Sequence, residues 1–249
     1  MIHSFLLIGQ SNMAGRGNIA DAHCIDTSHV KIMRNGRWME MFRPVNPDRK
    51  FSGVSLGESF GERYAAKYGV DAGLICCADG GTSLDQWQKG GFLYENAIYQ
   101  ARLAMRESVI VGILWHQGEA DCATELYTTY EERFARFRKD LCDDLNLHNV
   151  PFLIGCLGDF LPNCPLDDKL KNYYHLNNIF KKIAADNLLI GYVPAEGLGS
   201  NPDMLHFSAD ALYEFGIRYF DEYVRIRGDA VIDDGFAENS ESIRSMELL

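Results

Sequence analysis

The chain has 249 residues, a composition ordinary for a globular protein and a formal net charge of −11. A charge of this sign disfavours nucleic acid and anionic membranes as partners, because both are bound through basic patches. The length favours one α/β domain, which we assign to residues 1–228, followed by an acidic tail at residues 229–249. We expect the tail to be loosely held or to pack on a neighbouring subunit, so a homo-oligomer remains open.

The seven cysteines predict a reducing compartment. Their number is odd, and their spacing matches neither a disulfide framework nor a zinc ribbon. The apolar run at residues 3–8 is too short for a signal peptide and lacks a basic start. No apolar stretch approaches the roughly 20 residues of a membrane-spanning helix. We therefore expect a cytoplasmic protein, although a chain whose export signal had been removed would look the same.

The first part of the chain predicts a strand, a hairpin and a helix. Residues 3–8 form an apolar run that is typical of a buried strand. Residues 30–41 place Asn-Gly between two short extended runs, which indicates a β-hairpin. We interpret this hairpin as a surface insertion. A helix is predicted over residues 55–69, because Ser55 and Glu58 fit a capping box.

From residue 72 onward, short apolar runs alternate with helical patterns. Strands are predicted at residues 72–78, 109–115, 151–157 and 188–193, and helices at about residues 92–107, 124–147 and 168–186 and from Ser208. Such alternation is typical of α/β proteins with a parallel sheet covered by helices on both faces. With the first strand, the prediction is a central, mainly parallel sheet of five strands.

A serine, a histidine and an aspartate can be nominated as a reactive group. The first apolar run stops at Gly9, and Ser11 follows at the edge of the sheet where open α/β proteins form their sites. A serine attacks a carbonyl only if a base removes its proton, and His206 is the candidate base. Asp203 would orient the histidine ring. The ordinary alternatives are an N-cap for Ser11 and a surface loop for the other two.

Acyl transfer also needs hydrogen-bond donors that face the developing oxyanion. The candidates are the backbone N–H groups of Ser11 and Gly81 and the side-chain amide of Gln117. A tight turn after the second apolar strand would equally explain the glycine, and a tie between two loops would explain the glutamine.

Other patterns carry weaker signals. Glu119 and Asp121 could work as an acid–base pair, as in glycosidases, but we favour a hydrogen-bonded network that holds loops. His116 beside these carboxylates is a poor metal pattern without a second cluster, so we predict no metal site. The sequence contains no G-x-S-x-G elbow around Ser11 and no nucleotide-binding glycine motif.

Four segments, in the same order along the chain, resemble the SGNH hydrolase superfamily. More narrowly, they are similar to the sialate O-acetylesterase and acetylxylan esterase-like group, carbohydrate esterase family six. The segments are residues 9–15 (GQSNMAG), 80–84 (GGTSL), 115–121 (WHQGEAD) and 203–207 (DMLHF). Together they span most of the chain, which makes a chance match of all four implausible.

The resemblance implies a flavodoxin-like three-layer α/β/α sandwich and ester hydrolysis by a serine without a cofactor. It implies a catalytic triad of Ser11, Asp203 and His206. It also implies an oxyanion hole of Ser11, Gly81 and Gln117, the last in the place that an asparagine takes in most SGNH enzymes. The residues expected to line the site or to form its network are Gln10, Asn12, Thr82, His116 and Glu119.

We therefore expect a serine esterase that removes O-acetyl groups from a small carbohydrate through an acyl-enzyme. Acetylated simple sugars, sialates and xylo-oligosaccharides are the candidate substrates. One alternative is a catalytically silent carbohydrate-binding module, in which Trp38, Trp87 and Trp115 stack on sugar rings. The other is an esterase for different short acyl esters. The presence of all three triad candidates favours an enzyme.

Overall fold

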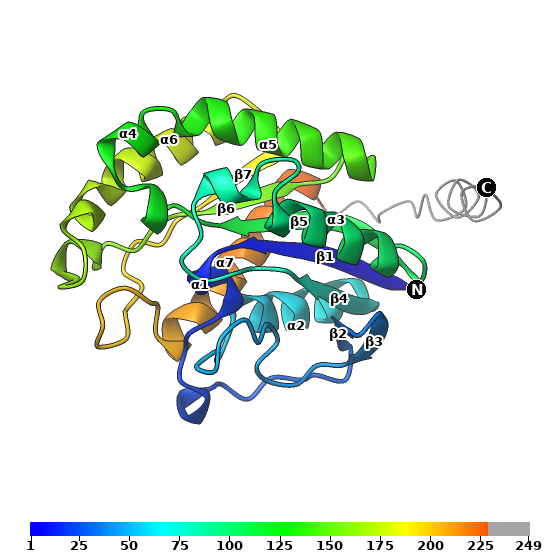
Figure 1. Ribbon diagram of the computed structural model, residues 1–249. Helices are drawn as coiled ribbons and strands as arrows, with labels where there is room; N and C mark the ends of the chain where they lie inside the picture. Colours follow the sequence, from blue (N-terminus) through cyan, green and yellow to red (C-terminus); the bar gives the residue numbers. More distant parts are fainter. Residues whose placement is uncertain (229–249) are drawn as a thin grey trace.

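The computed structural model describes residues 1–228, so the predicted tail at residues 229–249 lies outside the described residues. Seven strands form one sheet in the order β3-β2-β4-β1-β5-β6-β7, which Figure 1 shows edge-on between two layers of helices. The strands are β1 (Ile2–Gly9), β2 (Val30–Arg34), β3 (Arg37–Glu40), β4 (Asp71–Cys76), β5 (Ser108–His116), β6 (Phe152–Gly155) and β7 (Ile190–Val193). Only β2 and β3 pair antiparallel; the other neighbours are parallel. The predicted α/β class is confirmed.

The sheet has two more strands than predicted, because the hairpin belongs to it. The hairpin itself is as expected: Asn35 and Gly36 both have positive φ, which matches the turn that Asn-Gly favours. However, β2 also pairs in parallel with β4, where Val30 lies beside Ala72. Val30 and Ile32 are fully buried, so β2 has an apolar face that extends the core. The interpretation as a surface insertion was therefore wrong.

Helices cover both faces of the sheet. They are α1 (Ser11–Ala14), α2 (Leu56–Tyr68), α3 (Phe92–Ala104), α4 (Thr124–Tyr127), α5 (Tyr130–Leu145), α6 (Tyr173–Ala185) and α7 (Ala209–Arg227). On one face, α3, α5 and α6 pack around Leu6 and Ile8 of β1, and on the other α2 and α7 pack around Phe5 and Leu7 (Figure 1). The central strand is thus apolar on both faces, which explains its unbroken run.

The helix predicted over residues 124–147 is divided into α4 and α5. The division falls at Thr128 and Thr129, whose hydroxyls donate hydrogen bonds back to the carbonyls of Thr124 and Leu126. Threonine side chains that bond to nearby carbonyls compete with the helical backbone.

Two predicted helix starts are confirmed. Ser55 and Glu58 form a capping box at the start of α2, and the Ser208 hydroxyl accepts a hydrogen bond from the Ala211 amide at the start of α7. The second cap fixes the end of the loop that carries Asp203. None of the helices in the described part of the chain combines the length and apolar character needed to cross a bilayer.

Candidate active site

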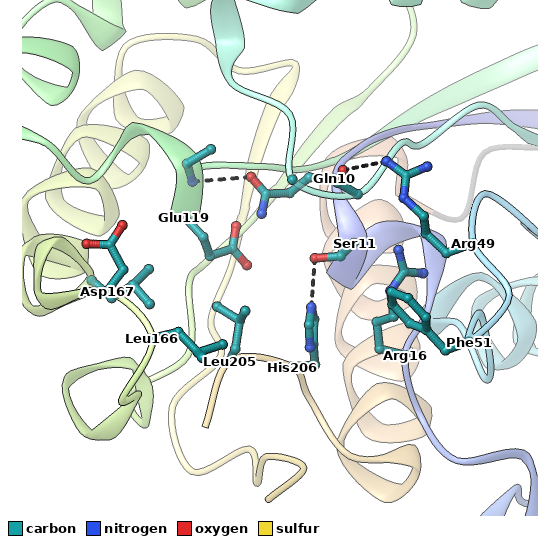
Figure 2. Close-up of a pocket in the computed structure, with 14 residues that line it drawn as sticks. Gln10, Ser11, Arg16, Arg49, Phe51, Glu119, Leu166, Asp167, Leu205 and His206 are labelled. Carbon is teal, nitrogen blue, oxygen red and sulfur yellow. Dashed lines mark hydrogen bonds between the residues drawn. The ribbon is translucent and has the colours of Figure 1, made fainter. Parts of the chain in front are cut away.

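Three side chains from the two ends of the chain meet above the carboxyl edge of the sheet. The Oγ atom of Ser11 lies 3.0 Å from Nε2 of His206, and Nδ1 of the same ring lies 2.6 Å from Oδ2 of Asp203. Figure 2 shows the serine and histidine joined by this hydrogen bond among the residues that line a pocket. Because a carboxylate only accepts hydrogen bonds, Nδ1 carries the proton and Nε2 is free to accept one from the serine hydroxyl.

Close approach of two strands places Ser11 at this edge. Gly9 has a φ of 128°, and a Cβ atom there would lie 2.1 Å from the backbone oxygen of His116. Glycine is therefore required where β1 ends against β5. The next amide, of Gln10, donates to that same oxygen. Ser11 then begins α1, so its own N–H lies outside the helical hydrogen-bond ladder and is available to a ligand.

A tight loop holds Asp203 against the histidine. Its Oδ1 accepts hydrogen bonds from the backbone amides of Leu205 and His206, at 2.9 and 3.0 Å. Burial acts to raise the pKa of Asp203, but the bonds from the His206 amide and ring and from Leu205 outweigh it and lower the pKa. The carboxylate is therefore ionised at neutral pH and can stabilise a positive charge on the ring.

Asn12 connects the loops around the serine. Its Nδ2 donates to Oε1 of Glu119 at 2.5 Å and to the Leu205 carbonyl at 3.3 Å, while its Oδ1 accepts from the Phe207 amide. These bonds tie the serine turn to the ends of β5 and of the histidine loop. Asn12 and Glu119 thus lie in a network, the arrangement that we expected for them.

Asp121 belongs to a buried network and does not form an acid–base pair with Glu119. Its carboxylate is fully buried and accepts from the Leu84 amide, from Gln117 and from Nη2 of Arg133 at 2.9 Å. Both carboxylate oxygens of Asp121 therefore accept hydrogen bonds from groups of the protein itself. The glycosidase alternative therefore has no geometric support.

His116 and Thr82 are held by hydrogen bonds close to the carboxyl edge of the sheet. The buried His116 ring donates from Nε2 to the Cys156 carbonyl, and burial lowers its pKa despite the nearby Glu119, so the ring is neutral. The Thr82 hydroxyl donates to the Asp79 carbonyl and accepts from Trp87, which holds the glycine turn. Among residues 1–228, no group of three or more His, Cys, Asp or Glu side chains is arranged to hold a metal ion.

The structure does not place Gln117 in an oxyanion hole, contrary to expectation. The side chain is fully buried and does not line the pocket. Its Nε2 donates to Asp121 at 2.7 Å, to the Thr82 carbonyl at 3.1 Å and to Oε1 of Gln10 at 3.3 Å. Its Oε1 accepts from the Tyr130 hydroxyl at 2.8 Å. An amide has two hydrogens, and three internal acceptors already share them.

The pocket above Ser11 has a volume of about 370 Å³. Gln10, Gly81, Glu119 and His206 line it around the serine. Gly81 has a φ of 78°, and no atom lies within 4 Å of where its Cβ would be, so glycine is needed for the backbone conformation and not for space. Ser11 and Gly81, whose backbone amides are the other two predicted oxyanion donors, therefore line the same pocket.

Two exposed apolar residues form what we call the pocket rim. Phe51, between β3 and α2, is 69% exposed, and Leu166, between β6 and α6, is 70% exposed. Figure 2 shows them on opposite sides of Ser11. The three tryptophans have no such position: Trp87 and Trp115 are fully buried in the core, Trp38 packs against it, and none lines the pocket. The alternative in which these tryptophans stack on sugar rings therefore has no support at this pocket.

An ion pair beside the glycine turn was missed in the sequence. Arg16 and Asp48 are joined by two hydrogen bonds, at 2.9 and 2.7 Å, with both side chains 4% exposed. Burial acts to raise the pKa of Asp48, but bonds from Arg16 and Ser52 prevail and lower it. Asp48 also accepts from the Gly80 amide, which fixes the turn before Gly81. Arg16 directly follows the GQSNMAG segment, which was the one available signal.

The fold and this pocket are those of a carboxylic ester hydrolase. A family model described as "Carbohydrate esterase, sialic acid-specific acetylesterase" matches residues 1–225, and the chain belongs to this family. The resemblance seen in the four sequence segments is confirmed, and the protein is a carbohydrate esterase.

An individual relative is similar to the chain in both sequence and structure. The chain is 27% identical over 247 residues to a probable carbohydrate esterase of Arabidopsis thaliana, and the match covers 88% of this chain and 89% of the relative. The X-ray structure of that Arabidopsis protein superposes with a TM-score of 0.76 at 25% identity, covering 90% of this chain and 98% of the other.

More distant structures share the fold. NanS gives a TM-score of 0.67 at 15% identity and covers 92% of this chain and 98% of its own. A carbohydrate acetylesterase from Xanthomonas citri gives 0.67 at 17% identity, with 90% of this chain and 56% of the other covered.

Proposed function

We propose that this carbohydrate esterase removes O-acetyl groups from a small acetylated carbohydrate through an acyl-enzyme formed on Ser11. The observation that carries the proposal is the line of hydrogen bonds from Ser11 through His206 to Asp203, at 3.0 and 2.6 Å, below an open pocket. The family match and the relatives described as carbohydrate esterases and acetylesterases support the acetylated sugar as substrate.

In the proposed first half-reaction, Nε2 of His206 takes the proton of Ser11 as its Oγ attacks the acetyl carbonyl. The backbone amides of Ser11 and Gly81 donate to the oxyanion. The imidazolium, held by the ionised Asp203, then gives its proton to the leaving sugar oxygen. The acetyl group remains on the serine, and the sugar departs as an alcohol.

In the second half-reaction, water takes the place of the sugar. His206 removes a proton from the water, the hydroxide attacks the acetyl-serine, and the same donors bind the second oxyanion. Acetate leaves, and the proton returns to Oγ of Ser11. Because every proton passes through one imidazole, the mechanism needs no further acid or base.

We place the sugar between the two sides of the pocket rim. Phe51 exposes its ring next to Arg16, whose guanidinium carbon lies 5.2 Å from the ring centroid. An exposed aromatic face is a suitable surface for the apolar side of a pyranose ring. Leu166 bounds the pocket on the opposite side (Figure 2).

The serine is tested by Ser11→Ala with p-nitrophenyl acetate as substrate. Loss of the nucleophile should lower kcat by roughly 10⁴–10⁶-fold, while the thermal midpoint stays close to that of the wild type. Undiminished turnover by a folded S11A protein would contradict the mechanism.

The substrate is tested by measuring acetate release from acetylated sialic acids, xylo-oligosaccharides and simple sugars. A parallel series of p-nitrophenyl esters of increasing acyl length separates an acetylesterase from an esterase for other acyl groups. The proposal requires a preference for acetyl esters and for at least one carbohydrate class. Equal or better turnover of longer acyl chains would contradict it.

A further inference from the structure

The glycine turn after β4 is held by an arginine from a distant loop. We propose that Arg49 is a positioning residue for the oxyanion hole: its guanidinium holds the peptide unit whose N–H, that of Gly81, donates to the oxyanion. This inference rests on the proposed function and adds the group that directs one of its donors. Arg49 lies between β3 and α2, and it lines the pocket.

The Gly80 carbonyl and the Gly81 N–H belong to the same peptide unit. Nη2 of Arg49 donates to this carbonyl at 3.0 Å, the bond that is drawn at Arg49 in Figure 2. A trans peptide unit is planar, and its C=O and N–H point in opposite directions. Because the carbonyl is held by Arg49, the Gly81 N–H is directed away from the guanidinium.

Two consecutive glycines make this peptide unit easy to rotate. Gly81 has a φ of 78°, and a glycine adopts positive and negative φ about equally well. No atom lies within 4 Å of where a Cβ of Gly81 would be, so side-chain packing does not restrain the residue. Hydrogen bonds must supply the restraint, and loss of the bond at the carbonyl should allow the unit to turn over.

The turn is bonded to the protein up to the Gly81 N–H. The Gly80 amide donates to Oδ2 of Asp48 at 2.9 Å, and the Gly80 carbonyl accepts from Arg49. The next polar group along the chain is the Gly81 N–H, and within residues 1–228 no protein acceptor takes its hydrogen. Two adjacent residues, Asp48 and Arg49, thus hold both sides of Gly80 and leave the Gly81 amide for a ligand.

Arg49 is itself held in place. Its Nη2 also donates to Oδ1 of Asp79 at 2.7 Å, and its Nη1 donates to the Asp48 carbonyl at 2.8 Å. The Arg49 backbone amide donates to the Ser52 hydroxyl at 3.0 Å. A guanidinium is a rigid, planar group that keeps its charge. Partners on two of its nitrogens therefore fix its plane against the turn.

The bond from Arg49 also strengthens the donor. A charged donor on a carbonyl polarises the whole peptide unit, and linked hydrogen bonds strengthen one another. The Gly81 N–H is therefore a better donor to a developing oxyanion than the N–H of an unpaired peptide. Arg49 acts through the peptide unit and not on the reacting atoms, which makes it a positioning residue.

The main test replaces Arg49 with Ala and, separately, with Lys. Complete loss of one oxyanion donor costs about 10²–10³-fold in kcat, and the turn keeps its bond to Asp48, so kcat of R49A for p-nitrophenyl acetate should fall about 10–100-fold. R49K keeps the charge without the planar pair of donors and should fall less. KM should change by less than about threefold in both variants. Thermal midpoints establish that each variant is folded.

Arg225→Ala is the matched control for the Arg49 variants. Arg225 is also an exposed arginine paired with a carboxylate, that of Glu222, and it does not line the pocket. Its loss should leave kcat and KM unchanged. An equal fall of kcat in R225A and R49A would show a general effect of surface charge and would overturn the inference.

Chemical rescue separates positioning from a structural effect. The Arg49 side chain is 40% exposed, so a small cation can reach the space that R49A leaves. Guanidinium chloride at a low, non-denaturing concentration should raise kcat of R49A by about fivefold or more and should leave the wild type unchanged. Methylammonium at the same ionic strength should not, because it lacks the planar pair of donors. No gain with guanidinium, or an equal gain with methylammonium, would overturn the inference.

A neutral substrate distinguishes positioning from direct binding of substrate. p-Nitrophenyl acetate carries no charge, so it gives an arginine no anionic group to bind. If R49A raises KM for an acetylated sialate but leaves kcat for p-nitrophenyl acetate within about threefold of the wild type, Arg49 binds the substrate and the inference fails. If Ser11→Ala is inactive in the same assays, the proposed function still stands. If Ser11→Ala remains active, the proposed function fails on its own account, whatever the Arg49 variants do.

Discussion

The floor of the pocket and its rim are built in different ways. We define the floor as Gln10, Ser11, His206 and Asp203, together with the buried groups that hold them. Gln10 and Ser11 are 3% and 6% exposed, whereas Phe51 and Leu166 of the rim are 69% and 70% exposed. The floor lies at strand ends and in loops tied to them by hydrogen bonds, while both rim residues lie in connecting loops.

This difference separates two tasks of the enzyme. The chemical step needs groups held within a few tenths of an ångström, and buried networks supply that precision. Recognition of a sugar needs contact area at the mouth, and it tolerates exposed side chains on variable loops. Changes in the floor should therefore act on kcat or on stability, and changes in the rim should act on KM.

The largest effect is expected at the aspartate of the floor. Asp203→Asn keeps the shape of the side chain but removes the charge that holds His206 in the correct tautomer. We expect kcat to fall by about 10³–10⁴-fold with little change in KM. Asp186→Asn is the matched control, since Asp186 is exposed and precedes β7, at the opposite edge of the sheet. A fall of less than tenfold for D203N would contradict the assigned role.

The next effect concerns the network below the floor. Asp121→Asn removes the negative partner of Arg133 in a fully buried position, so we expect a loss of about 3 kcal/mol in the free energy of unfolding. Chemical denaturation measures it. The control is Glu131→Gln, which breaks the exposed pair with Lys182 and should cost about 0.5 kcal/mol or less. Equal costs would show that burial does not distinguish the two pairs.

The pH dependence of stability tests the support under the glycine turn. The folded pKa of Asp48 is lowered, so the protein binds fewer protons at this site than the unfolded chain does. Its contribution is present above the ordinary aspartate pKa of about 3.9 and is lost as the pH falls through the lowered folded value. In Asp48→Asn, the free energy of unfolding should fall less steeply between about pH 5 and pH 3. The free energy of unfolding is measured by urea titration at each pH. If its dependence on pH is the same in D48N and in the wild type, Asp48 makes no such contribution.

Local patterns explain why the floor was predicted better than its supports. The strand before Ser11 is a continuous apolar run, and the cap at Ser208 is a local signal, so both were visible in the sequence. The bonding of Gln117 was not visible, because two of its partners, Thr82 and Tyr130, come from other segments of the chain. Whether the side-chain amide of a glutamine is free to bind a ligand therefore depends on partners that only the fold brings together.

The same reasoning applies to the edge of the sheet. The hairpin was predicted from Asn35 and Gly36, but its place beside β4 depends on a parallel register that no local pattern encodes. Asp48 was missed for a similar reason: its partner Arg16 precedes the hairpin in the sequence, whereas Asp48 follows it. Pairings between distant segments are set by the whole core, which no single window of sequence contains.

The smallest effect is expected at the rim, and it tests the comparison most directly. Phe51→Ala removes the exposed ring but leaves Arg16 paired with Asp48, so the floor keeps its support. We expect KM for an acetylated sugar to rise about five- to tenfold, equivalent to about 1 kcal/mol, while kcat and the turnover of ethyl acetate stay unchanged. Ethyl acetate is the informative reference because its leaving group is too small to stack on a ring.

Phe92→Ala provides the matched control for the rim. Phe92 is 83% exposed at the start of α3 and does not line the pocket, so the same loss of apolar surface should leave both substrates unaffected. If F51A lowers kcat for ethyl acetate as well, the rim contributes to the position of the catalytic groups and the division into two tasks is wrong. If F51A leaves KM for every sugar unchanged, the sugar binds elsewhere on the mouth, and Leu166 on the opposite side becomes the next residue to change.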